Sequence, residues 1–275
     1  MSVATFIPEI WNARLLNALR NELVYSNLFN RNYEGEIAAA GDTVHINTIN
    51  DITIKKYTRN TDIDNPEQLT TADQTLVVDQ SDYFNFYLND VDKAQALPGL
   101  VDASMQSAAH GLAEETDKYL AGLLAGVATF GATKQVTAAN AYDLIVDLKV
   151  KLDKANVAKV GRKVVLPPEF EGLMLMDSRF VTGTKGEGRL ENGAVAKAAG
   201  FDIYISNNVP EEGGVYKIIA TTNEGNTYAE QLLKTEAYRR EKGFDDGVKG
   251  LHVYGAKVLR PSAVAGVAVT FGGAE

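Results

Sequence analysis

The sequence predicts an α+β protein built from a long β-hairpin, one very long helix and a separate mixed α/β lobe. Apolar and polar residues alternate with the two-residue period of strands across much of residues 43–88. A helical period then persists for about 28 residues after Pro98 and Gly99. Helix and strand patterns alternate over residues 134–250, which favours a mixed sheet. A chain of 275 residues is long enough for two joined domains.

Composition and charge exclude several classes of protein. Hydrophobic residues make up 45% and charged residues 23%, as in ordinary folded proteins. The lack of cysteine excludes disulfides and thiolate chemistry and suits a reducing cytoplasm. Residues 1–8 do not resemble a secretion signal, and the apolar run at 121–128 is far shorter than the roughly 20 residues that span a bilayer. We therefore expect neither secretion nor a membrane anchor.

The net charge of −9 disfavours tight binding to nucleic acid, because proteins that grip phosphates carry clustered basic surfaces. A weakly acidic wall can nevertheless enclose DNA without trapping it.

Residues 8–28 predict an amphipathic N-terminal helix. Pro8 suits the first helical turn. Apolar residues recur at roughly helical spacing: Ile10, Trp11, Leu15, Ala18, Leu19 and Leu23. The helix packs either on its own core or on a neighbouring molecule, and the pattern does not separate the two.

Two alternating stretches, one beginning at Thr43 and one covering residues 75–88, predict the strands of a long hairpin. The polar run 58–73 between them predicts its tip. Strands of about 15 residues at roughly 3.3 Å each would reach on the order of 50 Å. A two-stranded ribbon is marginally stable and its edges invite pairing. We expect the hairpin to be covered by a second copy, with folding back on its own domain as the alternative.

The segment after Gly99 predicts a long helix. Seven residues are expected to share its buried face: Val101, Met105, Ala108, Leu112, Tyr119, Leu123 and Val127. Four charged residues are expected on its other faces: Glu114, Glu115, Asp117 and Lys118. A rod of this length, about 40 Å at roughly 1.5 Å per residue, is more often a scaffold than a site.

The following lobe predicts a helix over 140–156 with Asn140 as its cap, and a short helix from Pro168. Leu144, Ile145, Leu148 and Leu152 are the residues expected on the buried face of the first helix. Strands are predicted at 163–166, 203–206 and 215–221, with a glycine-rich loop at 182–193. The β-branched tail 248–270 is predicted to add edge strands beneath the long helix.

No motif in the sequence indicates catalysis, a cofactor or a metal. Residues 183–188 superficially suggest a phosphate loop, but Arg189 and Leu190 stand where Lys and Ser or Thr are required. His45, His110 and His252 lie far apart in sequence, and we expect them in a strand, a helix and a strand. Residues 62–65 resemble the start of a calcium loop but lack its glycine, and they predict a solvated tip.

The order of these parts resembles that of major capsid proteins of tailed bacteriophages with the HK-ninety-seven-like fold, in particular the P-twenty-two-type coat branch. The likeness spans nearly the whole chain. Four stretches carry it: Phe6-Ile7-Pro8-Glu9-Ile10-Trp11, Asn30-Arg31-Asn32-Tyr33-Glu34-Gly35 leading to Gly41-Asp42-Thr43-Val44, Gly200-Phe201-Asp202-Ile203-Tyr204-Ile205-Ser206-Asn207-Asn208-Val209-Pro210, and Gly250-Leu251-His252-Val253-Tyr254-Gly255-Ala256.

The resemblance implies a phage capsid fold with four parts. These are an N-terminal arm at 1–42, an extended E-loop hairpin at 43–88, a P-domain with the spine helix at 89–133 and 248–275, and an A-domain at 134–247. It implies that the E-loop lies over the P-domain of an adjacent subunit. Residues expected at contacts between subunits lie in the first helix, around the hairpin tip and in the glycine-rich loop: Trp11, Tyr57, Arg59, Asp62, Asp64, Glu67, Lys185 and Arg189.

The function implied is self-assembly, as hexamers and pentamers, into an icosahedral shell. The shell would enclose double-stranded DNA without binding it specifically, with a separate scaffolding protein and a portal as partners. We expect no cofactor, location in the virion and assembly in the host cytoplasm. Two alternatives remain at this point: the shell protein of a bacterial nanocompartment with the same fold, and an α/β enzyme that uses a nucleotide at residues 183–193.

Overall fold

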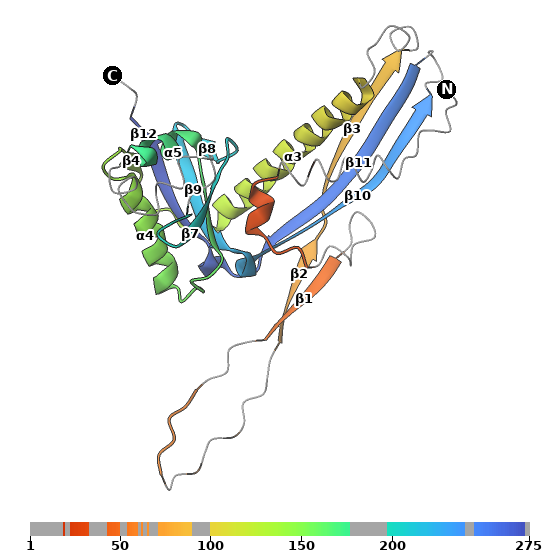
Figure 1. Ribbon diagram of the computed structural model, residues 1–275. Coiled ribbons are helices and arrows are strands. Elements are labelled where there is room, and N and C mark those ends of the chain that lie inside the picture. Colours follow the sequence, from red (N-terminus) through yellow and green to blue (C-terminus); the bar gives the residue numbers. More distant parts are fainter. Residues whose placement is uncertain are drawn as a thin grey trace.

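A computed structural model describes residues 19, 23–32, 43–49, 54–59, 62, 65, 71–89, 100–176, 197–239 and 245–272. Three parts are visible in Figure 1: a mixed α/β lobe, a long sheet accompanied by one long helix, and a thin extension that points away from both. The α+β class is therefore confirmed.

The mixed lobe is built on a seven-stranded sheet with the order β4-β12-β9-β5-β7-β6, in which β8 pairs with β9. Its elements are β4 (Lys134–Val136), α4 (Ala141–Lys154), β5 (Arg162–Leu166), α5 (Pro168–Leu175), β6 (Lys197–Ala198), β7 (Phe201–Ile205), β8 (Glu211–Glu212), β9 (Val215–Thr222) and β12 (Ala265–Phe271). The predicted helices and strands of this lobe are confirmed to within a few residues.

Both faces of this sheet are covered, as the side chains of β5 show. Val164 and Leu166 pack into the core beneath α4 and α5. Val165, which points the other way, packs with residues near the C-terminal end of the long helix. Strands buried on both faces are continuous runs of apolar residues, and Val164-Val165-Leu166 is such a run.

The predicted buried face of α4 is confirmed, because Leu144, Ile145, Leu148 and Leu152 are all buried. Asn140 occupies the cap position, but its side chain does not bond the helix. It accepts a hydrogen bond from the Thr137 N–H and donates one to the Gln135 carbonyl. The Asn140 side chain therefore stabilises the loop before α4 and does not cap the helix as predicted.

The long helix is α3 (Leu100–Val127), whose length and position confirm the prediction. It lies along an antiparallel three-stranded sheet with the order β10-β11-β3 (Figure 1), formed by β3 (Gln80–Asn89), β10 (Asn226–Arg239) and β11 (Asp245–Val258). Its buried face is rotated from the predicted one. Met105 and Leu112 are buried as expected, and Tyr119 and Leu123 are partly buried against the core, but the other buried apolar residues are Ala109, Ala113, Leu120, Ala121 and Leu124.

The prediction that Asp117 lies on a solvated face of this helix is wrong. Asp117 is only 2% exposed. Glu114 and Glu115 do stay at the surface, where both pair with Lys118.

The hairpin is shorter than predicted. β1 (Thr43–Ile49) pairs antiparallel with β2 (Thr71–Val77), from Thr43 opposite Val77 to Ile49 opposite Thr71. The chain then passes Val78 and Asp79 and enters β3, which pairs with β11 instead of β1. Residues 80–88 therefore belong to the three-stranded sheet. Their hydrogen-bonding partner is β11, which is distant in the sequence, and not the other strand of the hairpin as predicted.

The prediction that the tail forms edge strands beneath the long helix is also wrong. β11 is the central strand of its sheet, and β12 lies between β4 and β9 in the other sheet. Within this tail Gly255 lies inside β11, whereas the turn η5 (Pro261–Ala263) ends the strand and separates the two sheets.

Most of the predicted N-terminal helix lies outside the described residues. At its end, Leu23 is not helical, and η2 (Tyr25–Leu28) is a separate short turn of 3-10 helix. A further 3-10 turn, η4 (Asn223–Gly225), joins β9 to β10. Among the described residues, no helix is both long and apolar enough to cross a membrane.

Candidate inter-subunit surfaces

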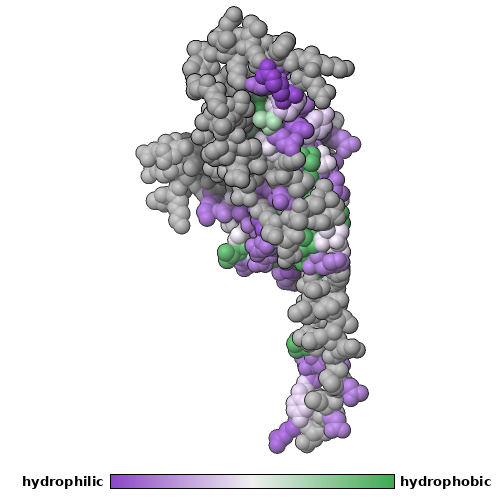
Figure 2. Space-filling model, turned by 90° about the vertical axis from the view of Figure 1, so that its right-hand side faces the viewer, coloured by the Kyte–Doolittle hydropathy of each residue, from purple (hydrophilic) through white to green (hydrophobic). Residues whose placement is uncertain are grey.

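The thin extension seen in Figures 1 and 2 carries an exposed segment of mixed character. We call residues 54–59, Ile54-Lys55-Lys56-Tyr57-Thr58-Arg59, the arm segment. Ile54 is 90% exposed and Tyr57 is 69% exposed. Large apolar side chains displayed this far from any core are typical of interaction sites. The arm segment is therefore the first candidate surface.

The paired strands β1 and β2, which we call the root of the extension, are in contrast packed on their own molecule. Val44 and Ile46 of β1 form a buried cluster with Leu76, Val78, Ala229 and Val253. Two side-chain bonds add to it: Lys257 Nζ donates to the Thr75 carbonyl at 2.8 Å, and Gln74 Nε2 donates to the Leu259 carbonyl at 3.2 Å. The alternative of folding back on its own domain thus applies to the root and not to the arm segment.

A glycine makes this root possible. A Cβ atom added at Gly255 of β11 would collide with the Val77 carbonyl oxygen and lie 2.8 Å from Val78 Cα. Because both are backbone atoms, no side-chain rotation relieves the clash. The end of β2, at Val77 and Val78, therefore packs backbone against backbone on β11 at Gly255.

The N-terminal segment is fixed to the same sheet by a buried ionic cluster. Arg31 Nη2 lies 2.7 Å from Glu230 Oε1, Tyr228 Oη donates to Glu230 Oε2 at 2.6 Å, and His252 Nε2 lies 3.5 Å from that oxygen. Burial alone would raise the pKa of Glu230, but His252, Arg31 and Tyr228 together lower it to about 2. Main-chain bonds between Asn30 and β10 complete the attachment.

Asp117 of α3 forms a second attachment for this segment. Its carboxylate accepts hydrogen bonds from the backbone N–H groups of Val24 and Tyr25, both at 3.0 Å. Burial raises the pKa of Asp117 to about 6, although these N–H groups and the Asn208 side chain oppose the shift. A cavity of about 410 Å³ lies beside it, lined in part by residues 205–208 of the mixed lobe. Asp117 therefore sits where the N-terminal segment, α3 and that lobe meet.

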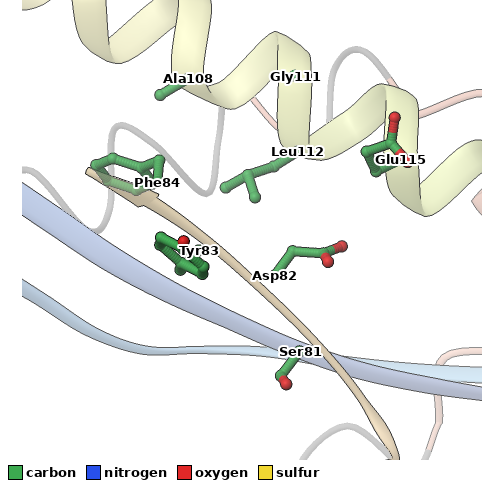
Figure 3. A pocket seen from close by; sticks show the side chains of 8 residues that line it. All are labelled: Ser81, Asp82, Tyr83, Phe84, Ala108, Gly111, Leu112 and Glu115. Carbon is green, nitrogen blue, oxygen red and sulfur yellow. The ribbon is translucent and has the colours of Figure 1, made fainter. Parts of the chain in front are cut away.

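A groove between β3 and α3 is the second candidate surface. It has a volume of about 360 Å³ and is lined by Ser81, Asp82, Tyr83, Phe84, Ala108, Gly111, Leu112 and Glu115. Figure 3 shows Phe84 of β3 and Leu112 of α3 between strand and helix, with Asp82 and Glu115 toward one end. Tyr83, on the outer side of the strand, is 77% exposed. We call these eight residues the groove.

The eight predicted contact residues fare differently. Tyr57, Arg59 and Asp62 are exposed on the extension. Trp11, Asp64, Glu67, Lys185 and Arg189 lie outside the described residues. The sequence did not single out the groove, although the alternation of Tyr83, Asn85 and Tyr87 with Phe84 and Phe86 is the pattern of a strand with an aromatic outer face.

The geometry offers little to catalysis. His45 lies in β1 and His110 in α3, both exposed, whereas His252 is buried in β11, so the predicted strand, helix and strand are confirmed. Within the described part of the chain, no three His, Asp or Glu side chains are grouped as metal ligands. The phosphate-loop and calcium-loop candidates at 183–188 and 62–65 lie wholly or partly outside it.

Comparison with solved structures finds the same fold in phage capsids. A chain in a structure of Mycobacterium phage Che8 is 29% identical, with a TM-score of 0.75 over 89% of this chain and 90% of that chain. The capsid of the cyanophage P-SCSP1u gives 15% identity and a TM-score of 0.69, over 91% and 89% of the two chains. A virus-like particle from Pyrococcus furiosus gives 13% identity and a TM-score of 0.61, over 94% and 98%.

No curated protein matches the sequence. A sequence profile of the family described as phage capsid protein matches residues 49–267, which is most of the chain. These matches favour neither the nanocompartment nor the nucleotide-using enzyme. The chain belongs to the phage capsid protein family, and it is a major capsid protein with the HK-ninety-seven-like fold.

Proposed function

We propose that copies of this chain assemble as hexamers and pentamers into a closed shell around double-stranded DNA, each copy laying its extension on a neighbour. The observation that carries this proposal is the contrast within the extension. Its root is fixed by backbone contacts at Gly255, whereas the arm segment displays Ile54 and Tyr57 to solvent. A rigid root with an apolar end is suited to bridging two molecules.

The domain roles follow the same proposal. Residues 43–77 act as the E-loop, the long helix and the three-stranded sheet, which includes β3, as the P-domain, and the seven-stranded lobe as the A-domain near the symmetry axes. Because β10 is hydrogen-bonded within the three-stranded sheet and β12 within the seven-stranded one, β10 is assigned to the P-domain and β12 to the A-domain, which changes the expected bounds of 134–247 and 248–275. Trp11, Tyr57, Arg59, Asp62, Asp64, Glu67, Lys185 and Arg189 are proposed to lie at subunit contacts.

Enclosure of DNA would require no specific site. A net charge of −9 supports a wall that does not bind its contents tightly. A separate scaffolding protein and a portal are the proposed further partners, and assembly would take place in the host cytoplasm. No catalytic activity is part of the proposal.

The experiment is to express the chain alone and with a separate scaffolding protein, and to examine both preparations by electron microscopy. Closed shells with sixfold and fivefold vertices are expected in at least one preparation. A protein that stays monomeric in both would contradict the proposal. The exposed Lys159, which lies in the mixed lobe away from the extension, provides a control position for substitutions.

A further inference from the structure

Residues 23–32, which we call the strap, lie across the joint between the long helix and the mixed lobe. The turn η2 of the strap lies beside α3 (Figure 1). Lys163 Nζ of β5 donates a hydrogen bond to the Asn27 carbonyl at 2.6 Å. Three apolar side chains of the strap pack in one buried cluster with the C-terminal half of α3 and with β5 and β9: Tyr25, Leu28 and Phe29. The strap is therefore part of the contact between the two regions.

One end of the strap is held by backbone hydrogen bonds and by an ion pair. The Asn30 N–H donates to the Asn226 carbonyl at 2.9 Å, and the Tyr228 N–H donates to the Asn30 carbonyl at 3.0 Å. Next to it, Arg31 brings a cation to the buried Glu230 carboxylate at 2.7 Å. Burial would raise the pKa of Glu230, but its partners lower it to about 2. Since arginine also keeps its charge, this ion pair does not change near neutral pH.

The other end of the strap is held by a carboxyl group whose donors are neutral. The N–H groups of Val24 and Tyr25 donate to the two carboxylate oxygens of Asp117, both at 3.0 Å, and the Asn208 side chain is a third partner. Uncharged donors offset only part of the cost of burying an ionised carboxylate. Burial therefore raises the pKa of Asp117 to about 6.

Among the described residues, the titratable groups that face Asp117 come from α3 and from the strap. α3 contributes His110 and Glu114, which line the adjoining cavity of about 410 Å³. The strap contributes Tyr25, whose pKa is raised by burial and by Asp117 far above its usual range, so the phenol stays protonated. The mixed lobe contributes residues 206–208, Ser-Asn-Asn, which carry no charge.

Ionisation of Asp117 acts against the closed position of the strap. When the strap leaves α3, water from the cavity reaches the carboxyl group, which then has the ordinary aspartate pKa of 3.8. The closed state thus binds the proton more tightly than the open state. Its advantage is fully present below pH 3.8 and is lost as the pH rises through about 6.

We propose that the strap is a pH-sensitive latch, hinged at Asn30 and Arg31, whose other end leaves α3 more readily once the Asp117 carboxyl group has lost its proton. Opening the latch loosens the packing of Tyr25 and Leu28 between α3 and the mixed lobe, so that the two regions can shift against each other. Such a latch is a property of the single subunit and holds whether or not shells form.

Hydrogen exchange of single backbone amides tests the latch. Protection factors, which remove the intrinsic pH dependence of exchange, are compared in the folded subunit at about pH 5 and about pH 7.5. The amides of Val24 and Tyr25 should lose protection roughly tenfold over this range, because the closed state then gives up its bound proton. The amides of Asn30 and Tyr228, at the hinged end, should change less than about twofold.

Substitutions identify the group that titrates. Asp117→Asn keeps an oxygen acceptor but cannot ionise, so the protection of Val24 and Tyr25 should become independent of pH. Glu114→Gln and His110→Gln are the matched controls, because both residues are titratable, lie on the same helix and line the same cavity. Both controls should keep the roughly tenfold change.

Each outcome decides the proposal. A loss of protection that is confined to the end at Val24 and Tyr25 and abolished by Asp117→Asn alone supports the latch. Three results overturn it: no change with pH, an equal loss at Asn30, or a pH dependence that survives in Asp117→Asn. If Asp117→Asn does not fold, the wild-type comparison of the two ends decides together with the two controls. Shell formation is scored separately and bears only on the proposed function.

Discussion

The two sheets of this subunit differ in how completely one copy of the chain covers them. In the seven-stranded sheet, β5 sends Val164 and Leu166 into one core and Val165 into another. In the three-stranded sheet, β3 sends Phe84 toward α3 but leaves Tyr83, its chain neighbour, 77% exposed. The first sheet is completed by folding, whereas the second keeps one face and an adjoining groove open. We therefore expect stability to depend mainly on the first sheet and assembly mainly on the second.

The largest effect is expected from a substitution in the core of the seven-stranded lobe. Phe170 of α5 is buried in the core beneath the seven-stranded sheet. Phe170→Ala should lower the free energy of unfolding by about 3–5 kcal/mol, because a cavity remains where the ring was. Urea denaturation measures this loss. Leu175→Ala on the same helix, where the side chain is largely exposed, is the control and should cost less than about 1 kcal/mol; equal losses would contradict the distinction.

A smaller loss is expected where the N-terminal segment is attached to the open sheet. Arg31→Gln removes the cation that faces the fully buried Glu230 carboxylate and should cost about 3 kcal/mol, because a buried charge is left without its main partner. Arg239→Gln is the matched control, since the ion pair of Arg239 with Asp246 is exposed. The control should change stability by less than about 1 kcal/mol in the same denaturation experiment.

The pH dependence of the free energy of unfolding should show the ionisation of Asp117, which lies where α3, the N-terminal segment and the mixed lobe meet. Burial places the folded pKa of Asp117 at about 6, above the ordinary aspartate pKa of 3.8, so the folded state binds this proton more tightly than the unfolded state. The resulting stability is fully present below pH 3.8 and is lost as pH rises through about 6. The loss from this group amounts to about 3 kcal/mol.

Denaturation of the wild type and of Asp117→Asn between pH 3.5 and 7.5 isolates this contribution. We expect the wild-type curve to fall relative to that of the variant over roughly pH 4 to 6, since only the wild type can ionise at this position. Parallel curves would show that Asp117 does not titrate in that range.

The smallest effect on the isolated subunit is expected on the open face. Tyr83→Thr keeps a strand-forming residue and should change the free energy of unfolding by less than about 0.5 kcal/mol. Shell formation should nevertheless weaken, because Tyr83 stands at the rim of the groove. Denaturation and the yield of assembled particles, measured side by side, would separate the two effects. A large loss of subunit stability would mean that this face is not reserved for assembly.

Several of the stretches that carried the resemblance have a physical explanation in the fold. In 250–256, Gly255 allows the hairpin root to cross β11, and a Cβ at Gly250 would lie 2.5 Å from Phe84 Cζ. His252 of the same stretch joins the Glu230 cluster, and so does Arg31 from another. In 200–210, Gly200 has a φ of 87°, which lets the chain turn into β7. Close backbone approach and burial of charge leave few substitutes at these positions.

The sequence by itself determined the local elements: the 28-residue helix, the α4 face and the strands of the mixed lobe follow from hydrophobic period, and the capsid family follows from their order. Only the tertiary structure decided that β3 leaves the hairpin to pair with β11, that β12 joins the other sheet, and that Asp117 is buried. The physical reason is that a two-residue period states which side chains face a core but not which strand supplies the hydrogen bonds. Likewise, a carboxylate on a helix surface becomes interior only when a segment distant in sequence brings it backbone N–H groups.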